Sequence, residues 1–261
     1  MTLGKISKWG LTLVFLISLF FLPACFDPAP GVMYIPVLDI TASIDPVAEA
    51  GMFASVDSLA RHLHRGDSLA IILVTEDVQA NAPGQVLHYE VSRTREPYDA
   101  DLNKLAATMH VDLEAEKRAA LAHPANQTDL LGAVSLAAEQ ATARPGAGRY
   151  VLLILSDFLQ DDREFDFSRV AQLTDAQRAA KFAEEMAHSR EQRLPAGTLA
   201  YMGLLRSHDY ASLSKGRRQA LETFWMRYLT LLGAQPAFAT DGPGLLIPFF
   251  DRAQSSVPAL K

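Results

Sequence analysis

Apolar runs and amphipathic stretches alternate along most of the chain. Runs rich in Val, Ile and Leu predict buried strands, and "VMYIPVLD" and "YVLLILS" are the strongest of them. The run "QVLHYEVS" instead alternates apolar with polar residues, as an edge strand of a sheet does. The predicted strands are 32–39, 67–76, 85–92, 149–158, 197–205 and 236–240. The predicted helices between them are 46–66, 98–122, 128–143, 176–192 and 215–234.

This order of elements predicts the fold class. Hydrophobic strands separated by helices are typical of a mainly parallel sheet that is covered by helices on both faces. We therefore expect a doubly wound, Rossmann-like α/β domain, with the strand 149–158 near its centre and the strand 85–92 antiparallel at its edge. The sequence shows no internal repeat and no second domain boundary, so a single domain over 32–250 is expected.

The first 24 residues have a different pattern from the predicted domain. Lys5 and Lys8 precede an apolar stretch over 9–24 without acidic residues, which is typical of a secretory signal peptide. The sequence "LPAC" that ends in Cys25 resembles the lipobox of bacterial lipoproteins, which implies that this cysteine becomes the lipid-modified first residue. The alternative is an uncleaved membrane anchor, and either would tether the chain to a membrane.

The lipoprotein resemblance also implies a location in the bacterial cell envelope. In Gram-negative lipoproteins a residue other than aspartate after the lipidated cysteine usually permits transfer to the outer membrane, and Phe26 stands there. We therefore expect a protein anchored in the outer membrane and facing the periplasm. Residues 25–31 form a short proline-containing linker in this interpretation, and residues 251–261 a C-terminal tail.

Charge and cysteine content narrow the functional classes. Cys25 is the only cysteine, so no internal disulfide is possible. The formal net charge is −6, and it becomes −8 after removal of residues 1–24, which hold two lysines and no acid. Because nucleic-acid binding needs clustered Lys and Arg, this balance disfavours a nucleic-acid partner. The sequence also lacks the glycine-rich and nucleophile motifs of common nucleotide-binding enzymes and hydrolases.

Oxygen-bearing side chains follow two of the predicted central strands. Asp39 and Asp157 each stand at a strand end, and ligands of such sheets bind beyond the carboxyl ends of the strands. Two buried acids need a partner, and Mg²⁺, which prefers oxygen ligands, is the natural one. Thr41 and Ser43 follow Asp39 at intervals of two, and in an extended chain such residues point the same way. Thr128, at the start of a predicted helix, offers a further hydroxyl from a neighbouring loop.

These segments resemble the motifs of von Willebrand factor A domains. "DITAS" at 39–43 is similar to the D-x-S-x-S signature, with threonine in place of the first serine. "QTDLLGAV" is similar to the threonine segment of that family, and "LLILSDF" to its second aspartate segment. The runs "RGDSLAIILV" and "ALETFWMRYLTLLGA" are similar to its second strand and last helix, so that the resemblance covers roughly 32–250.

The resemblance implies a metal-dependent adhesion site that takes Mg²⁺, with Mn²⁺ able to replace it. Thr41, Ser43 and Thr128 would contact the cation through their hydroxyl oxygens, and Asp39 and Asp157 would act directly or through water. A carboxylate from a partner protein would take the remaining position. Such a site serves binding rather than catalysis, so an enzyme is not expected.

Two alternatives remain open at this point. One is an envelope scaffold that binds its partners without metal and whose site is idle. The other is a Mg²⁺-dependent phosphohydrolase like the haloacid dehalogenases, with Asp39 as nucleophile, although Thr41 stands where that family has its general acid. Phe158 occupies a position that is glycine in many von Willebrand factor A domains, which we expect to narrow the site's rim or change its loop.

Two further motifs have simpler interpretations. "RGD" at 65–67 lies between a predicted helix and a predicted strand, so we interpret it as a helix end and a turn rather than as an adhesion motif. "DDREFD" at 161–166 is expected to be a solvated acidic loop, placed where it could affect the choice of partner.

Overall fold

The computed structural model describes residues 30–75, 78, 86–122, 127–162 and 164–239. The strands are β1 (Val32–Asp39), β2 (Ser68–Val74), β3 (Val86–Glu90), β4 (Arg149–Ser156), β5 (Thr198–Leu204) and β6 (Ala234–Ala239). The longer helices are α2 (Pro46–Arg61), α4 (Asp99–Ala122), α5 (Leu130–Ala143), α6 (Ala176–His188) and α8 (Lys215–Leu231). Two short helices, η1 (Ala171–Thr174) and α7 (His208–Ser212), complete the described part of the chain.

The six strands form one sheet in the order β3-β2-β1-β4-β5-β6. All neighbouring pairs are parallel except β2 with β3, which is antiparallel and lies at the edge. The predicted fold class is therefore confirmed: this is a doubly wound α/β fold of the Rossmann-like and von Willebrand factor A-like type. The predicted places of the edge strand and of the central strand β4 are confirmed as well.

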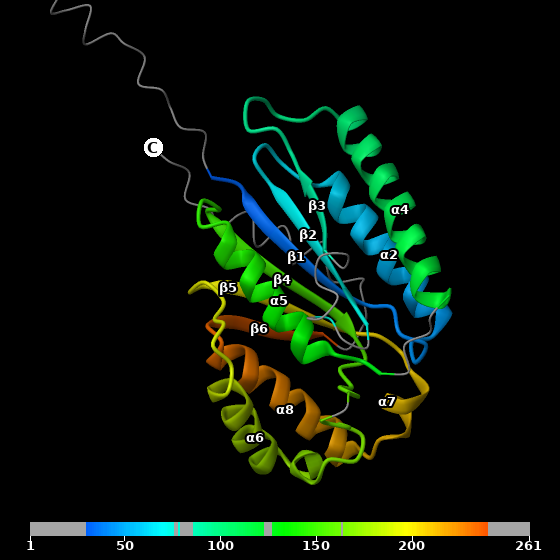
Figure 1. The fold of residues 1–261 in the computed structure, drawn as a ribbon, viewed down its shortest axis with the longest axis vertical. Helices are drawn as coiled ribbons and strands as arrows, with labels where there is room; N and C mark the ends of the chain where they lie inside the picture. The colour runs from blue at the N-terminus through cyan, green and yellow to red at the C-terminus, as the bar shows by residue number, and fades with distance from the viewer. Residues whose placement is uncertain (1–29, 76–77, 79–85, 123–126, 163, 240–261) are drawn as a thin grey trace, which may run out of the picture.

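Helices cover both faces of the sheet, as Figure 1 shows, with α2 and α4 on one face and α5, α6 and α8 on the other. The two faces are set by the alternation of side chains along each strand. In β1, Met33, Ile35 and Val37 pack with α5, α6 and α8, whereas Tyr34 and Leu38 pack with α2 and α4. A strand that is buried on both faces needs apolar residues at almost every position, which explains the continuous hydrophobic runs in the sequence.

Strand order reverses between β1 and β4. The chain leaves β1 towards β2 on one side of the sheet, whereas β4 lies on the other side and leads on to β5 and β6. The loops after β1 and β4 therefore diverge and leave a crevice at the carboxyl ends of these two strands, where doubly wound folds bind their ligands. We call this the carboxyl edge of the sheet, and the opposite side the amino edge.

The "RGD" stretch lies at the amino edge and has a structural role. Gly66 has φ +82°, a left-handed conformation that suits glycine in the turn that leads from α2 to β2. The carboxylate of Asp67 is buried, and it accepts hydrogen bonds from the backbone N–H of Val32 (2.7 Å) and of His64 (2.9 Å). Asp67 thus attaches the start of β1 to the turn before β2, which leaves it no freedom to serve as an adhesion motif.

Some boundaries differ from the prediction. Helix α2 ends at Arg61, five residues before the predicted end at Gly66, and the sequence patterns gave no sign of η1 and α7. The predicted signal peptide over 1–24, the lipidated Cys25 and the tail over 251–261 lie outside the described residues. Within the described ranges, no helix combines the length and the apolar character needed to span a membrane.

Candidate metal centre

The carboxyl edge brings the two predicted acids to neighbouring strands. Asp39 is the last residue of β1, and Asp157 directly follows β4. The two strands pair in parallel, with Leu38 opposite Leu155, so both acids emerge at the same place. Their exposed fractions are 0% and 1%. Two carboxylates without water around them are unfavourable unless hydrogen bonds or a cation compensate.

A turn after β1 gathers the first three predicted oxygens. Thr41 donates a hydrogen bond from Oγ1 to Asp39 Oδ1 (2.6 Å), and its backbone N–H donates to the same oxygen (3.1 Å). Ser43 Oγ lies 3.0 Å from Thr41 Oγ1. The expected reason for this convergence was wrong, because β1 ends at Asp39 and the backbone turns, with the N–H of Ile44 donating to the carbonyl of Thr41 (3.3 Å). The turn, and not an extended chain, brings the hydroxyls together.

Thr128 joins this group from the loop before α5. Its Oγ1 lies 3.4 Å from Thr41 Oγ1, and its side chain is buried. The backbone around it is fixed by two hydrogen bonds with Asp161, one from Thr128 N–H to the Asp161 carbonyl (2.5 Å) and one in return (3.0 Å). Asp129, the N-cap of α5, accepts from the N–H of Gly132 (2.8 Å) and holds the helix start in place. Three separate segments thus bring hydroxyl and carboxylate oxygens to one point.

Asp157 supplies the oxygen that most needs a partner. Its Oδ1 accepts a hydrogen bond from the N–H of Leu159 (3.0 Å). Its Oδ2 is buried and has no hydrogen-bond partner among the residues that the structure describes. A buried carboxylate oxygen without a partner carries a desolvation penalty of about 1–3 kcal/mol or more, which a bound cation would offset.

Asp157 is one of the residues that line a cavity of about 400 Å³, which opens at the carboxyl edge. The cavity is lined by Thr41, Ala42, Ser43, Thr128, Asp157, Leu159, Gln160, Asp161, Asp166, Ser168, Asp209 and Ser212. Four of the five predicted site residues are therefore in its wall. The fifth, Asp39, is fully buried and does not line the cavity. It is connected to the cavity wall by its hydrogen bond with Thr41.

Burial and mutual repulsion govern the electrostatics of the two acids. Burial raises the pKa of Asp39, although hydrogen bonds from Thr41 and Ser156 oppose the change. Burial, and then the charge of Asp39, raise the pKa of Asp157 to about 7, although hydrogen bonds to this carboxylate from the Ser207 hydroxyl and the Leu159 N–H oppose the change. Two neighbouring buried carboxyls therefore do not both ionise easily near neutral pH. A divalent cation between them would reverse this, because its charge favours both ionised forms.

The donor set suits a hard cation. Carboxylate and hydroxyl oxygens, completed by water, are what Mg²⁺ binds, and the set contains no sulfur or imidazole that would favour zinc. Across the part of the chain that the structure describes, no three side chains of His, Cys, Asp or Glu converge as a metal site. A cation at Asp39 and Asp157 would therefore depend on the hydroxyls of Thr41, Ser43 and Thr128 and on water.

Ser156 is a residue of this site that the sequence analysis missed. Its Oγ donates to Asp39 Oδ2 (2.7 Å) and accepts from the N–H of Phe158 (2.9 Å). It thereby fixes the carboxylate of β1 against the loop that follows β4. The sequence did contain a signal for this role, because Ser156 is a hydroxyl residue at the end of an otherwise apolar strand. The sequence analysis treated it only as part of that strand.

Phe158 has an unusual backbone and an inward side chain. Its φ is +64°, the one left-handed value outside glycine among the described residues. Its ring is fully buried against Trp225 and Phe238, with ring centroids 6.1 and 5.3 Å away, and its carbonyl accepts from Trp225 Nε1 (2.9 Å). The side chain therefore does not narrow the rim of the site, which was one of the two effects expected at this position. The position keeps the left-handed turn for which glycine is suited and adds an aromatic anchor in the core.

The raised pKa of Asp157 leads to a prediction about stability. In EDTA the free energy of unfolding is expected to fall as pH rises from about 4 to 7. Over this range Asp157 keeps its proton in the native state but loses it in the unfolded chain, where its pKa has the ordinary value of 3.8. Saturating Mg²⁺ should flatten this dependence. Urea unfolding at several pH values, with and without Mg²⁺ and in Asp157→Asn as the matched control, measures it. The same pH slope in all three samples would contradict the assignment.

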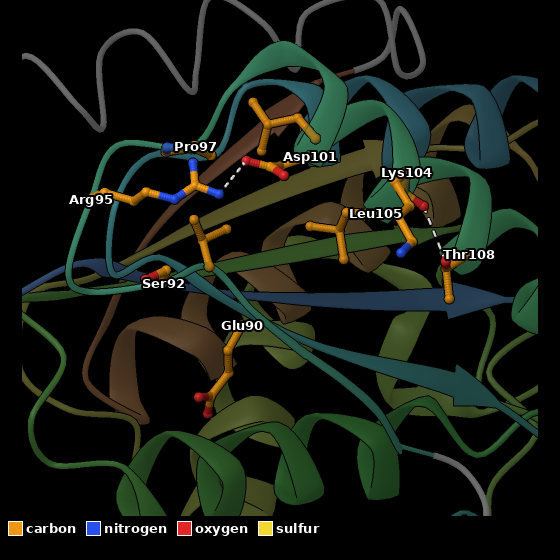
Figure 2. Close-up of a pocket in the computed structure, with 10 residues that line it drawn as sticks. Glu90, Ser92, Arg95, Pro97, Asp101, Lys104, Leu105 and Thr108 are labelled. Carbon is orange, nitrogen blue, oxygen red and sulfur yellow. Dashed lines mark hydrogen bonds and ion pairs between the residues drawn. The ribbon is translucent and has the colours of Figure 1, made fainter.

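A second cavity, of about 310 Å³, lies at the amino edge, beside the end of β3 and the first turns of α4. Figure 2 shows Arg95 pointing to Asp101, with which it forms an ion pair (2.9 Å), and Thr108 bonded to the carbonyl of Lys104 (3.0 Å). Glu90 and Ser92, also drawn there, pair with Arg144 and Thr94 outside the cavity. Among the described residues that line this cavity, none has a buried side-chain oxygen without a partner, as Asp157 does. This second cavity therefore lacks the feature that makes the carboxyl edge a candidate cation site.

Comparisons with known proteins bear on the fold alone. No family model matches the sequence, and no curated protein matches it. Similar solved structures include the ArnB paralog VWA2 from Sulfolobus acidocaldarius (10% identity, TM-score 0.42) and, in its open conformation, the pilus adhesin SpaC from Lactobacillus rhamnosus GG (8%, 0.48). A third is the manganese-loaded TRAP protein of Plasmodium vivax (12%, 0.35).

These structures differ in how far they correspond to this chain. They match 84%, 87% and 85% of it, but this chain spans only 44% of VWA2, 30% of SpaC and 74% of TRAP. At such identities and TM-scores, none of the likenesses indicates what this chain binds. The candidate site therefore depends on its own geometry.

Proposed function

We propose that this chain is a membrane-anchored lipoprotein of the bacterial cell envelope that binds a partner protein through a Mg²⁺-dependent adhesion site. Mn²⁺ can occupy the same site in place of Mg²⁺. The cation is held by Asp39, Thr41, Ser43, Thr128 and Asp157, and a carboxylate of the partner completes its coordination. The anchor is the lipid on Cys25, and the domain over 32–250 faces the periplasm from the outer membrane.

The observation that carries this proposal is the unpartnered Oδ2 of Asp157. The oxygen is buried, and Asp157 lines a cavity that is open to solvent together with the hydroxyl-bearing Thr41, Ser43 and Thr128, so a cation bound by these residues would remain accessible from outside. The direct ligands are mostly neutral hydroxyls, which leave the charge of the cation incompletely balanced. A carboxylate that arrives from another protein can then coordinate the cation at close range, although the other acids of the cavity wall oppose its approach.

The phosphohydrolase alternative has less support from the same geometry. A nucleophilic Asp39 would need a carboxylate oxygen free to attack a phosphate, but Oδ1 accepts two hydrogen bonds from Thr41 and Oδ2 accepts one from Ser156. Asp39 is also fully buried beneath the cavity wall. We propose that Asp39 positions the hydroxyl ligands and contributes charge, and that the chain is not an enzyme.

The metal dependence of partner binding is the prediction that tests this function. Proteins from an envelope extract of the native host that bind the immobilised chain in Mg²⁺ are expected to elute with EDTA, while circular dichroism shows the chain still folded. Ser43→Ala should reduce the amount captured only about 3- to 10-fold, because water can replace a neutral ligand. Capture that EDTA leaves unchanged would favour the metal-independent scaffold instead.

A further inference from the structure

The cavity at the metal centre is surrounded by more acid than a single divalent cation can balance. Asp161 and Asp166 come from the loop after β4, and Asp209 comes from α7, more than forty residues further along the chain. We call these three residues the rim acids. They line the same cavity as the buried, unpartnered Oδ2 of Asp157, so the acidic wall surrounds a group that itself needs a cationic partner.

The neighbouring cations neutralise only part of this rim. Asp166 forms an ion pair with Arg169 (3.2 Å) and accepts hydrogen bonds from the N–H and Oγ of Ser168 (2.9 and 2.5 Å). In the described part of the chain, no ion pair is formed by Asp161 or Asp209. Burial, and then the charges of Asp166 and Asp162, raise the pKa of Asp161, as expected for acids that repel one another.

The sum of the charges around the cavity indicates which kind of partner the rim acids would favour. The two strand-end acids and the three rim acids carry five negative charges when ionised. Arg169 and one divalent cation together offset three of them, and two further charges beside the rim, those of Arg217 and Asp162, cancel one another, which leaves an excess of two. A partner that contributed only a carboxylate would increase this excess, and like charges in a partly enclosed cavity oppose binding. A partner that also contributed a positive side chain would remove the conflict.

We propose that the partner presents a Lys or Arg close to its metal-binding carboxylate, and that this side chain lies against Asp161 and Asp209. The inference depends on the proposed metal-dependent function and adds the chemistry of the partner to it. The carboxylate reaches the cation at the centre, and the positive group occupies the rim. The rim acids would thereby disfavour partner segments that carry only acidic residues, although a bound cation by itself would attract such segments.

Short labelled peptides test this inference without knowledge of the natural partner. One set carries a single Asp in a glycine background with one Lys at each spacing up to about four residues, and a matched set has Gln in place of Lys. In Mn²⁺, fluorescence anisotropy should show at least one Lys peptide binding about 5- to 30-fold more tightly than its Gln counterpart. The preference should shrink at high salt, because Asp161 and Asp209 are exposed to solvent.

Variants of the full-length chain identify the residues responsible. Asp161→Asn and Asp209→Asn should each reduce the Lys preference at least about twofold, and together abolish it. Asp99→Asn, which removes an exposed acid at the amino edge, is the matched control and should leave the preference unchanged.

Three results would overturn the inference. Equal metal-dependent binding of both sets would do so and leave the proposed function intact. A loss of one of two bound Mn²⁺ ions in Asp161→Asn would mean that the rim holds a second cation instead. Failure of every peptide to bind in a metal-dependent way would overturn the inference but not the proposed function. The proposed function would be overturned as well only if the chain also failed to bind Mn²⁺ in a titration.

Discussion

Asp39→Asn is expected to weaken Mn²⁺ binding by about 100-fold or more while the chain stays folded, since loss of even an outer contact of a metal site typically costs 10- to 100-fold. The substitution removes a negative charge beside the cation. It keeps the shape of the side chain and an oxygen that can accept from Thr41. The hydroxyl of Ser156 can reverse its role and accept from the new amide. Calorimetric titration with Mn²⁺ and a thermal unfolding curve measure the two effects.

Asp39→Ala is the harsher form of the same change. It would leave the Thr41 N–H and the hydroxyls of Thr41 and Ser156 without their acceptor, so a loss of stability of about 2–4 kcal/mol is expected along with the loss of metal binding. Asp99→Asn serves as control for the change in net charge. If Asp39→Asn bound Mn²⁺ as tightly as the unaltered chain, Asp39 would have no part in a metal centre.

Phe158→Ala is expected to destabilise the fold by about 3–5 kcal/mol, the usual cost of removing a fully buried aromatic side chain. Phe158→Gly removes the same ring but also relieves the left-handed backbone, which costs a residue with a Cβ about 1–2 kcal/mol. We therefore expect the glycine variant to be no less stable than the alanine variant, the reverse of the order usual elsewhere.

Urea unfolding of the two variants measures this difference directly. Metal binding should be weaker in both, because Phe158 follows Asp157 and its carbonyl is bonded to Trp225. Trp225→Phe, which keeps a large ring but removes the indole N–H, separates the contribution of that hydrogen bond. A glycine variant less stable than the alanine variant by about 1 kcal/mol would show that the backbone of Phe158 is not strained.

Much of the fold could be predicted because this sheet leaves a strong signal in the sequence. Strands such as β1 and β4 are buried on both faces and appear as unbroken apolar runs. The edge strand β3 has one face partly exposed and therefore alternates. Helices α2 and α5 begin with Asp45 and Asp129, whose carboxylates cap the first backbone N–H groups.

The short helices gave no comparable signal. Helix α7 has five residues, too few for a 3.6-residue period to appear, and none of them is buried. It nevertheless brings Asp209 to the cavity, so this acid could not be connected with the site from the sequence. Contacts of this kind depend on how the loops of a doubly wound fold come together, and not on local pattern.

The site was predicted as a set of residues, but not as an arrangement. Asp39, Thr41, Ser43, Thr128 and Asp157 do come together, yet a turn after β1 brings the first three together and Ser156 fixes the carboxylate. The inward ring of Phe158 was also unforeseen. A glycine-like backbone position gives no information about where a larger side chain would point.

The central claim is that the carboxyl edge of the sheet binds a divalent cation, and a titration of the unaltered chain tests it most directly. The full-length chain, purified in detergent because of its apolar first segment and freed of metal with EDTA, is titrated with Mn²⁺ and then with Mg²⁺ in a calorimeter. We expect one site for either ion, and release of protons when the titration is run near pH 6, because Asp157 must ionise to bind. No heat of binding by either ion, or binding that Asp39→Asn and Asp157→Asn leave unchanged, would contradict the account.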